Sequence, residues 1–157
     1  MTRVVENRRL YVPAFGSIYR AFDPIAYPVL RIMIGLLFVP HGMQKLFQMF
    51  GGRTIEQYSK GFSRMGEFWG SAGWVYYIGA LEFVGGLCIA LGLFTRFWAF
   101  QMAAFMAIAA FVANAPRGWF WTAGGSEAAF SWFIVLGYVC VYGGGRFSVD
   151  SAMKKEI

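Results

Sequence analysis

Four side chains that can hold or transfer a proton stand within, or at the edge of, otherwise apolar stretches of the sequence. His41 and Lys45 are four residues apart, so they share one face of a helix. Glu82 is the only charged residue in a later apolar stretch, and Glu127 begins the last one. A carboxylate beside an imidazole in an apolar site can exchange protons near neutral pH, which is the chemistry that proton-coupled redox of a quinone requires.

The expected depths of these groups bring them together. At 1.5 Å rise per residue, His41 lies about 12 Å below the end of its helix, Glu82 lies at a similar depth in the next helix, and Lys45 is about 6 Å deep. We therefore expect Glu82 to reach His41 and Lys45, with Glu127 and Asn114 at the rim of the same cavity. Two interpretations stay open: an ion pair that only neutralises Glu82, or a proton-handling pocket in the outer half of the membrane. In the second, His41, Lys45, Glu82 and Glu127 are catalytic, and His41 and Asn114 bind the quinone.

The composition predicts that these residues lie in a membrane protein. Of the 157 residues 58% are hydrophobic and only 14% are charged, where a soluble domain carries roughly 25% charged residues. Four apolar stretches are long enough to be helices in a bilayer, which predicts an all-α membrane protein with a four-transmembrane-helix bundle. The expected spans are 27–49, 74–93, 97–113 and 128–142, with Thr95-Arg96 as a tight turn between the second and third.

The one long connection, residues 51–71, has the pattern of an amphipathic interfacial helix between spans one and two. Thr54 and Gln57 have the spacing of a capping box. Apolar residues then follow at helical spacing: Ile55, Tyr58, Phe62, Met65 and Trp69. The segment is either a membrane-surface anchor or a lid over the bundle. Residues 12–22 predict a second, short interfacial helix, which should end where Pro24 and Pro28 mark the entry to span one.

The chain divides into an N-terminal cytoplasmic or interfacial segment (1–24), a membrane domain (25–150) and a cytoplasmic tail (151–157). Residues 1–10 are polar and basic and are expected to be disordered. Basic residues flank the spans unequally, eight on the side of the termini against four on the other, which predicts that both termini are cytoplasmic. The eight are Arg3, Arg8, Arg9, Arg20, Arg96, Arg146, Lys154 and Lys155; the four are Arg53, Lys60, Arg64 and Arg117.

The remaining polar residues predict little chemistry of their own. Arg31 is expected to extend toward lipid headgroups. Cys88 and Cys140 are read as core thiols, with a redox pair as the alternative, and Trp132 is expected on the outer face of span four. No haem, metal, nucleotide or nucleic-acid motif is visible, so electrons would have to come from a substrate or a partner.

Three motifs in order resemble the DoxX family of small integral membrane proteins. They are Arg31…Gly35-x-x-Phe38-x-x-His41-Gly42-x-x-Lys45-Leu46-Phe47, then Glu82-x-x-Gly85-Gly86 continuing to Leu91-Gly92-Leu93-x-Thr95-Arg96, then Gly143-Gly144-Gly145-Arg146-Phe147-Ser148-x-Asp150. The resemblance implies a four-helix membrane domain. The family takes in subunits of a thiosulfate:quinone oxidoreductase and proteins of oxidative-stress complexes. Where many relatives carry a His before a Pro-x-Gly turn, this chain has Asn114.

The leading hypothesis is a subunit of quinone-linked redox metabolism in the bacterial inner (plasma) membrane. A non-catalytic accessory subunit of a larger respiratory or photosynthetic complex is the alternative, and a small-solute or lipid transporter is third. The expected partners are the lipid bilayer and either a larger membrane complex or further copies of the chain, without nucleic acid.

Overall fold

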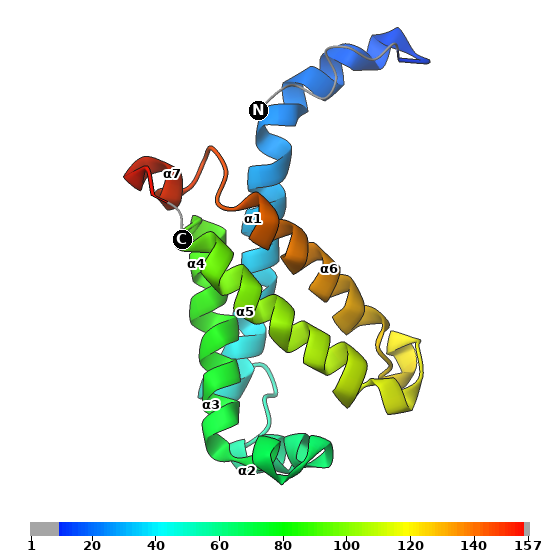
Figure 1. Ribbon diagram of the computed structural model, residues 1–157, viewed down its shortest axis with the longest axis vertical. Helices are drawn as coiled ribbons and strands as arrows, with labels where there is room; N and C mark the ends of the chain where they lie inside the picture. Colours follow the sequence, from blue (N-terminus) through cyan, green and yellow to red (C-terminus); the bar gives the residue numbers. More distant parts are fainter. Residues whose placement is uncertain (1–9, 156–157) are drawn as a thin grey trace.

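A computed structural model describes residues 10–155 of the chain, and every regular element within them is helical (Figure 1). The α-helices are α1 (Gly16–Phe47), α2 (Ile55–Phe62), α3 (Ala72–Ala80), α4 (Gly86–Leu91), α5 (Thr95–Ile108), α6 (Glu127–Tyr142) and α7 (Val149–Met153). Two π-helical turns, η4 (Leu81–Gly85) and η5 (Ala109–Ala113), continue α3 and α5. Single 3-10 turns are η1 (Pro13–Phe15), η2 (Ser63–Met65), η3 (Glu67–Gly70), η6 (Ala115–Arg117) and η7 (Trp121–Ala123).

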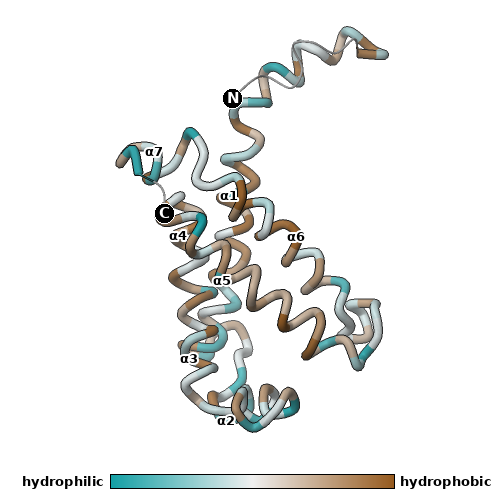
Figure 2. Tube along the Cα trace, in the orientation of Figure 1, coloured by the Kyte–Doolittle hydropathy of each residue, from teal (hydrophilic) through white to brown (hydrophobic). Residues whose placement is uncertain are grey.

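Three helical stretches of the described chain are long and apolar enough to cross a membrane. They are Pro13–Phe47, Ala72–Leu91 and Thr95–Ala113. The fourth apolar helix, α6, has 16 residues and is shorter than these. Figure 2 shows hydrophobic residues along the long helices and hydrophilic residues gathered around α2, α7 and the turn between α5 and α6.

The long helices form two pairs that cross each other. α1 packs against α3 and α4, and α5 packs against α6 (Figure 1). The first pair approaches closely at Gly35, where a Cβ atom would lie 2.5 Å from the backbone nitrogen of Ala90. Small residues at such contacts let helix backbones pack in lipid. Between the pairs lies an apolar core with members from α1, η4, α4, α5 and α6, which include Phe38, Leu81, Ile89, Met102 and Leu136.

The prediction of a separate interfacial helix over residues 12–22 is wrong. α1 runs unbroken from Gly16 to Phe47 with Pro24, Pro28 and Pro40 inside it. A proline removes one backbone hydrogen bond and kinks a helix without having to end it, and the first turns of α1 are inclined to the rest (Figure 1). The expectation of disorder for residues 1–10 falls almost wholly on residues 1–9, which lie outside the described chain.

The turn between α4 and α5 lies earlier than predicted. Thr95 and Arg96 are the first residues of α5, and the turn is made by Gly92 and Phe94, which have φ angles of 73° and 48°. The cause is Asp150, whose carboxylate accepts hydrogen bonds from the backbone N–H groups of Phe94 (2.7 Å) and Thr95 (3.0 Å) and so caps α5 from outside. Asp150 belongs to α7, which crosses the predicted boundary at residue 150.

Arg31 does not extend toward headgroups as predicted. Its side chain is 1% exposed and donates hydrogen bonds to three backbone carbonyls, those of Gly144 (2.6 Å), Phe147 (2.8 Å) and Ala90 (3.3 Å). The carbonyl groups of Gly144 and Phe147, in the segment after α6, face Arg31, so its two terminal nitrogens are bonded inside the protein, whereas its buried Nε forms no hydrogen bond with the described residues. We call Arg31, Asp150 and the backbone groups they bond the latch, because they join α1, α4, α5 and the segment after α6.

The segment between α1 and α3 folds as the capping box predicts. The hydroxyl of Thr54 accepts from the backbone N–H of Gln57, and the side chain of Gln57 accepts from the backbone N–H of Thr54. We call residues 55–70, which comprise α2, η2 and η3, the lid segment. It lies at the end of the molecule opposite α7 (Figure 1).

Candidate functional site

A cavity of about 300 Å³ brings together three of the polar residues that the sequence singles out. His41, Glu82 and Asn114 all line it, and they come from α1, from η4 and from the residue that follows η5. The other lining residues are apolar: Leu37, Phe38, Phe105, Met106, Ala109, Ala129 and Trp132. We call this space the His41 cavity. It is accessible from the surface of the molecule, because both Leu37 and His41 are exposed.

The two π-helical turns place the polar groups of this cavity. Glu82 lies within η4, and Asn114 directly follows η5. A π turn inserts an extra residue into a helix and changes the direction of the side chains around it, and such turns are frequent at functional sites. In this chain each of the two π turns adjoins a polar residue of the same cavity.

Glu82 is held by an ion pair with Lys45. The Lys45 Nζ lies 2.5 Å from Glu82 Oε2, and the same Nζ donates to the backbone carbonyl of His41 at 3.3 Å. The pairing expected from the matched depths of these residues is therefore present. Glu82 is 4% exposed, so its charge needs this partner. Lys45 lines a second, larger cavity, which places the ion pair in the wall between the two cavities.

Two other sequence-based placements differ from the structure. Glu127 is not among the residues that line either cavity, and its carboxylate accepts a hydrogen bond from the backbone N–H of Trp121 at 3.1 Å. This hydrogen bond therefore stabilises the turn that precedes α6. Trp132 does not face outward: it lines the His41 cavity, where its ring meets that of Phe38 edge-on at 5.0 Å. Both cysteines, Cys88 and Cys140, are free thiols, each half-buried.

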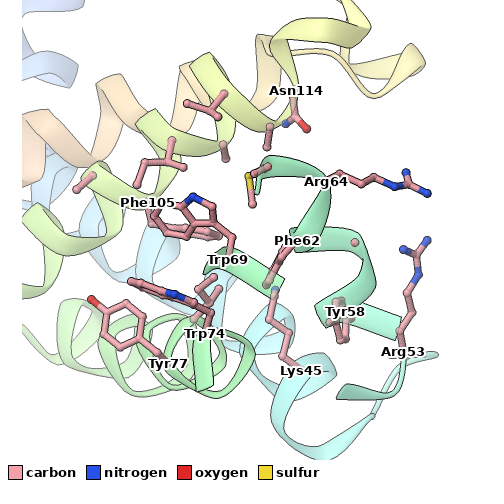
Figure 3. A pocket seen from close by; sticks show the side chains of 18 of the residues that line it. Lys45, Arg53, Tyr58, Phe62, Arg64, Trp69, Trp74, Tyr77, Phe105 and Asn114 are labelled. Carbon is pink, nitrogen blue, oxygen red and sulfur yellow. The ribbon is translucent and has the colours of Figure 1, made fainter. Parts of the chain in front are cut away.

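The larger cavity, of about 860 Å³, was not foreseen in detail from the sequence. It lies between the lid segment, α3 and α5, and Figure 3 shows the side chains that line it. We call it the lid cavity. The feature of the sequence that could have indicated this cavity is the helical spacing of Tyr58, Phe62 and Trp69, because all three side chains line it. Phe105, Ala109 and Asn114 line both cavities.

The ion pair permits a direct test by double substitution. Glu82→Gln leaves Lys45 without its partner and should lower the free energy of unfolding by about 1–3 kcal/mol. Because the two groups bond each other, the combined Glu82→Gln, Lys45→Met change should cost less than the sum of the two single changes. The measurement is thermal unfolding in detergent. If the double substitution costs as much as the two single substitutions added together, Glu82 and Lys45 do not stabilise each other.

Comparison with known proteins gives one family and no individual relative. The model of the DoxX family matches residues 26–115, which is more than half of the chain. The matched region contains His41, Lys45, Glu82 and Asn114 but ends before α6 and the latch residue Asp150. Neither the comparison with curated proteins nor that with solved structures finds a match.

Proposed function

The chain belongs to the DoxX family, and we propose that it is a multi-pass membrane subunit of quinone-linked redox metabolism whose quinone ring binds in the His41 cavity. One observation carries this proposal: His41, Glu82 and Asn114 converge on a small cavity whose remaining wall is apolar and aromatic. A mostly apolar cavity with a few convergent polar groups is the usual form of a small-molecule site. The edge-on pair of Phe38 and Trp132 offers flat surfaces for a ring.

Each polar residue of the cavity has a role in this proposal. The imidazole of His41 donates to a carbonyl oxygen of the ring and supplies or takes up its proton. The amide of Asn114 donates to the second carbonyl oxygen. Glu82 and Lys45 connect the cavity to the lid cavity and pass protons between them. Reduction of a quinone to a quinol consumes two electrons and two protons, and the electrons come from a reduced substrate or a partner subunit.

The opening of the cavity suits a ligand with a long apolar tail. Leu37 is 50% exposed and adjoins the exposed His41 on the outer surface of α1. A ring bound inside would leave its tail to run out over Leu37 into the lipid. Glu127 is not part of this proposed site, because it lines neither cavity.

The same proposal includes four membrane crossings with cytoplasmic termini in a bacterial inner membrane. α6 packs along α5 and is apolar apart from Glu127 and Ser131, so we take it as the fourth crossing, although its 16 residues cover only about 24 Å. The first turns of α1 and α7 lie at one end of the molecule and the lid segment at the other (Figure 1). Because Lys and Arg are in excess on the side of the termini, we place that end of the molecule on the cytoplasmic side of the membrane. The lid segment then lies at the outer membrane surface.

Replacing His41 tests the redox proposal. His41→Ala should lower the quinone bound per purified chain by about three- to tenfold, the effect of losing one hydrogen bond of about 0.5–1.5 kcal/mol. The measurement is solvent extraction of protein purified from its native membrane, with quantification of the quinone by absorbance. Ile134→Ala, on the exposed face of α6, is the matched control and should retain wild-type quinone.

A second function is favoured by the first turns of α1. Together with η1 they expose Phe15, Tyr19 and Phe22, each at least 48% accessible, on a helical segment inclined to the rest of the molecule (Figure 1). Such an apolar surface suits docking of an accessory subunit onto a larger membrane complex. If the wild-type protein carries no quinone, or His41→Ala leaves the quinone unchanged, the redox proposal fails. Partner chains that co-purify would then support the accessory role.

A further inference from the structure

The lid cavity has an aromatic end and a cationic end. Figure 3 shows Trp69, Trp74, Tyr77 and Phe105 together at one end, and Arg53 with Arg64 at the other. The two tryptophan rings lie 4.8 Å apart and Tyr77 meets Trp74 edge-on at 5.5 Å. One end can therefore enclose apolar groups while the other attracts anions.

The two guanidinium groups at the cationic end are not neutralised by an ion pair. Within residues 10–155, neither Arg53 nor Arg64 forms an ion pair, and no acidic side chain lines the cavity. Glu56, the acidic residue of α2, pairs with Lys60 at 2.9 Å, and this hydrogen bond and the Lys60 charge lower the pKa of Glu56. Lys45 also lines the cavity, but its charge is balanced by Glu82. Arg117 also lines the cavity, so its lining carries a net positive charge, and two of the cations, Arg53 and Arg64, are exposed.

The apolar part of the cavity is open to the side. Phe100 and Val112, both on the α5–η5 stretch, line the cavity and are 65% and 51% exposed. This stretch is one of those that can cross a membrane. A hydrocarbon chain from the bilayer can therefore enter the cavity past these two residues without crossing a polar surface.

We propose that the lid cavity binds an anionic phospholipid. Its phosphate is held by Arg53 and Arg64, since guanidinium groups bind phosphate oxygens through paired hydrogen bonds. One acyl chain packs against the aromatic end and leaves past Phe100 into the bilayer. Tryptophan and tyrosine are the side chains that occur at the level of lipid headgroups, and basic pockets beside membrane helices bind anionic headgroups.

This site is separate from the proposed quinone site. The two cavities share only the wall residues Phe105, Ala109 and Asn114, and neither arginine lines the His41 cavity. A bound phospholipid would hold the lid segment against α3 and α5, whether or not the chain binds quinone. Loss of quinone on His41→Ala and loss of phospholipid on replacement of the arginines are therefore independent results.

The test compares two lipids on three forms of the chain. The protein is purified in a neutral detergent, stripped of lipid, and titrated in mixed micelles with dioleoylphosphatidylglycerol or dioleoylphosphatidylcholine, with binding followed by native mass spectrometry. The wild type should bind the anionic lipid at least about tenfold more tightly than the zwitterionic one. Arg53→Gln with Arg64→Gln should remove this preference, and both side chains are exposed, so the fold should survive.

The matched control is Arg20→Gln with Lys60→Gln, which makes the same change in net charge. Both residues are exposed and lie outside the cavity, Lys60 on the lid segment itself. This control should keep the preference for the anionic lipid. Equal affinity of the wild type for the two lipids, or an equal loss in the control variant, would overturn the proposal. Displacement of the lipid by inorganic phosphate at millimolar concentration would also overturn it, by showing a site for a free anion.

Discussion

Asp150→Ala should lower the free energy of unfolding by about 3–5 kcal/mol, although the residue lies outside the apolar helices. The carboxylate is 1% exposed and accepts three hydrogen bonds, two from backbone N–H groups and one from the Thr95 hydroxyl at 2.7 Å. Removing it leaves three donors without an acceptor at the start of α5, and each buried unsatisfied group costs about 1–3 kcal/mol. The measurement is thermal unfolding in detergent, followed by circular dichroism.

Two further variants show whether the carboxylate geometry is the cause. Asp150→Asn retains one acceptor oxygen, but its amide N–H groups would face the donors of Thr95, so it should recover less than half of the loss. Asp23→Ala, an exposed carboxylate on α1, should change stability by less than about 0.5 kcal/mol. A loss for Asp150→Ala no larger than that of Asp23→Ala would show that the latch does not stabilise the fold.

Hydropathy alone was enough to predict most helix ends, because backbone polar groups in lipid must be bonded within the helix. The expected stretches 97–113 and 128–142 differ by one or two residues from Thr95–Ala113 and Glu127–Tyr142. The π turns could not be predicted in this way. They depend on how α3 and α5 pack against their neighbours, and no local pattern distinguishes them from α-helix. The continuity of α1 was missed because proline was read as a helix boundary.

Depth along a helix predicted the site only in part. It paired Glu82 with Lys45 correctly, because adjacent antiparallel helices place residues of equal depth side by side. It failed for Glu127, which is at a suitable depth but bonds the turn that precedes its own helix. Depth also gives no direction around the helix axis, so Trp132 was placed on the outer face when its ring contacts Phe38 inside.

The partners of Arg31 could not be predicted from depth or periodicity. Two of its acceptors, the carbonyls of Gly144 and Phe147, are more than a hundred residues away in the sequence. They become available because the chain after α6 turns back at Gly143–Gly145, where Gly143 and Gly145 have positive φ angles. Arg31, Thr95 and Asp150, one from each resemblance motif, therefore belong to one structural unit, the latch, whereas His41, Lys45 and Glu82 of the same motifs line the two cavities.

Arg31→Met should accordingly destabilise the fold by about 3–5 kcal/mol, as expected when one member of a buried charged network is removed. The change leaves the carbonyls of Gly144, Phe147 and Ala90 without this donor and removes a positive charge that interacts with the buried Asp150. The unfolding temperature in detergent is the readout, and it should fall well below that of a neighbouring exposed variant, Leu30→Met.

Arg31→Lys separates the geometry of the guanidinium from its charge. A lysine keeps the positive charge near Asp150, but a single ammonium group cannot reach three carbonyls that lie on two different segments of the chain. We expect it to recover less than half of the stability lost in Arg31→Met. Gly92→Ala should act in the same direction, because its Cβ would collide with the Arg31 guanidinium, whose Cζ would be only 2.8 Å away. Full recovery by lysine would mean that charge, and not the bridging of α1 to the turn after α6, is what the latch requires.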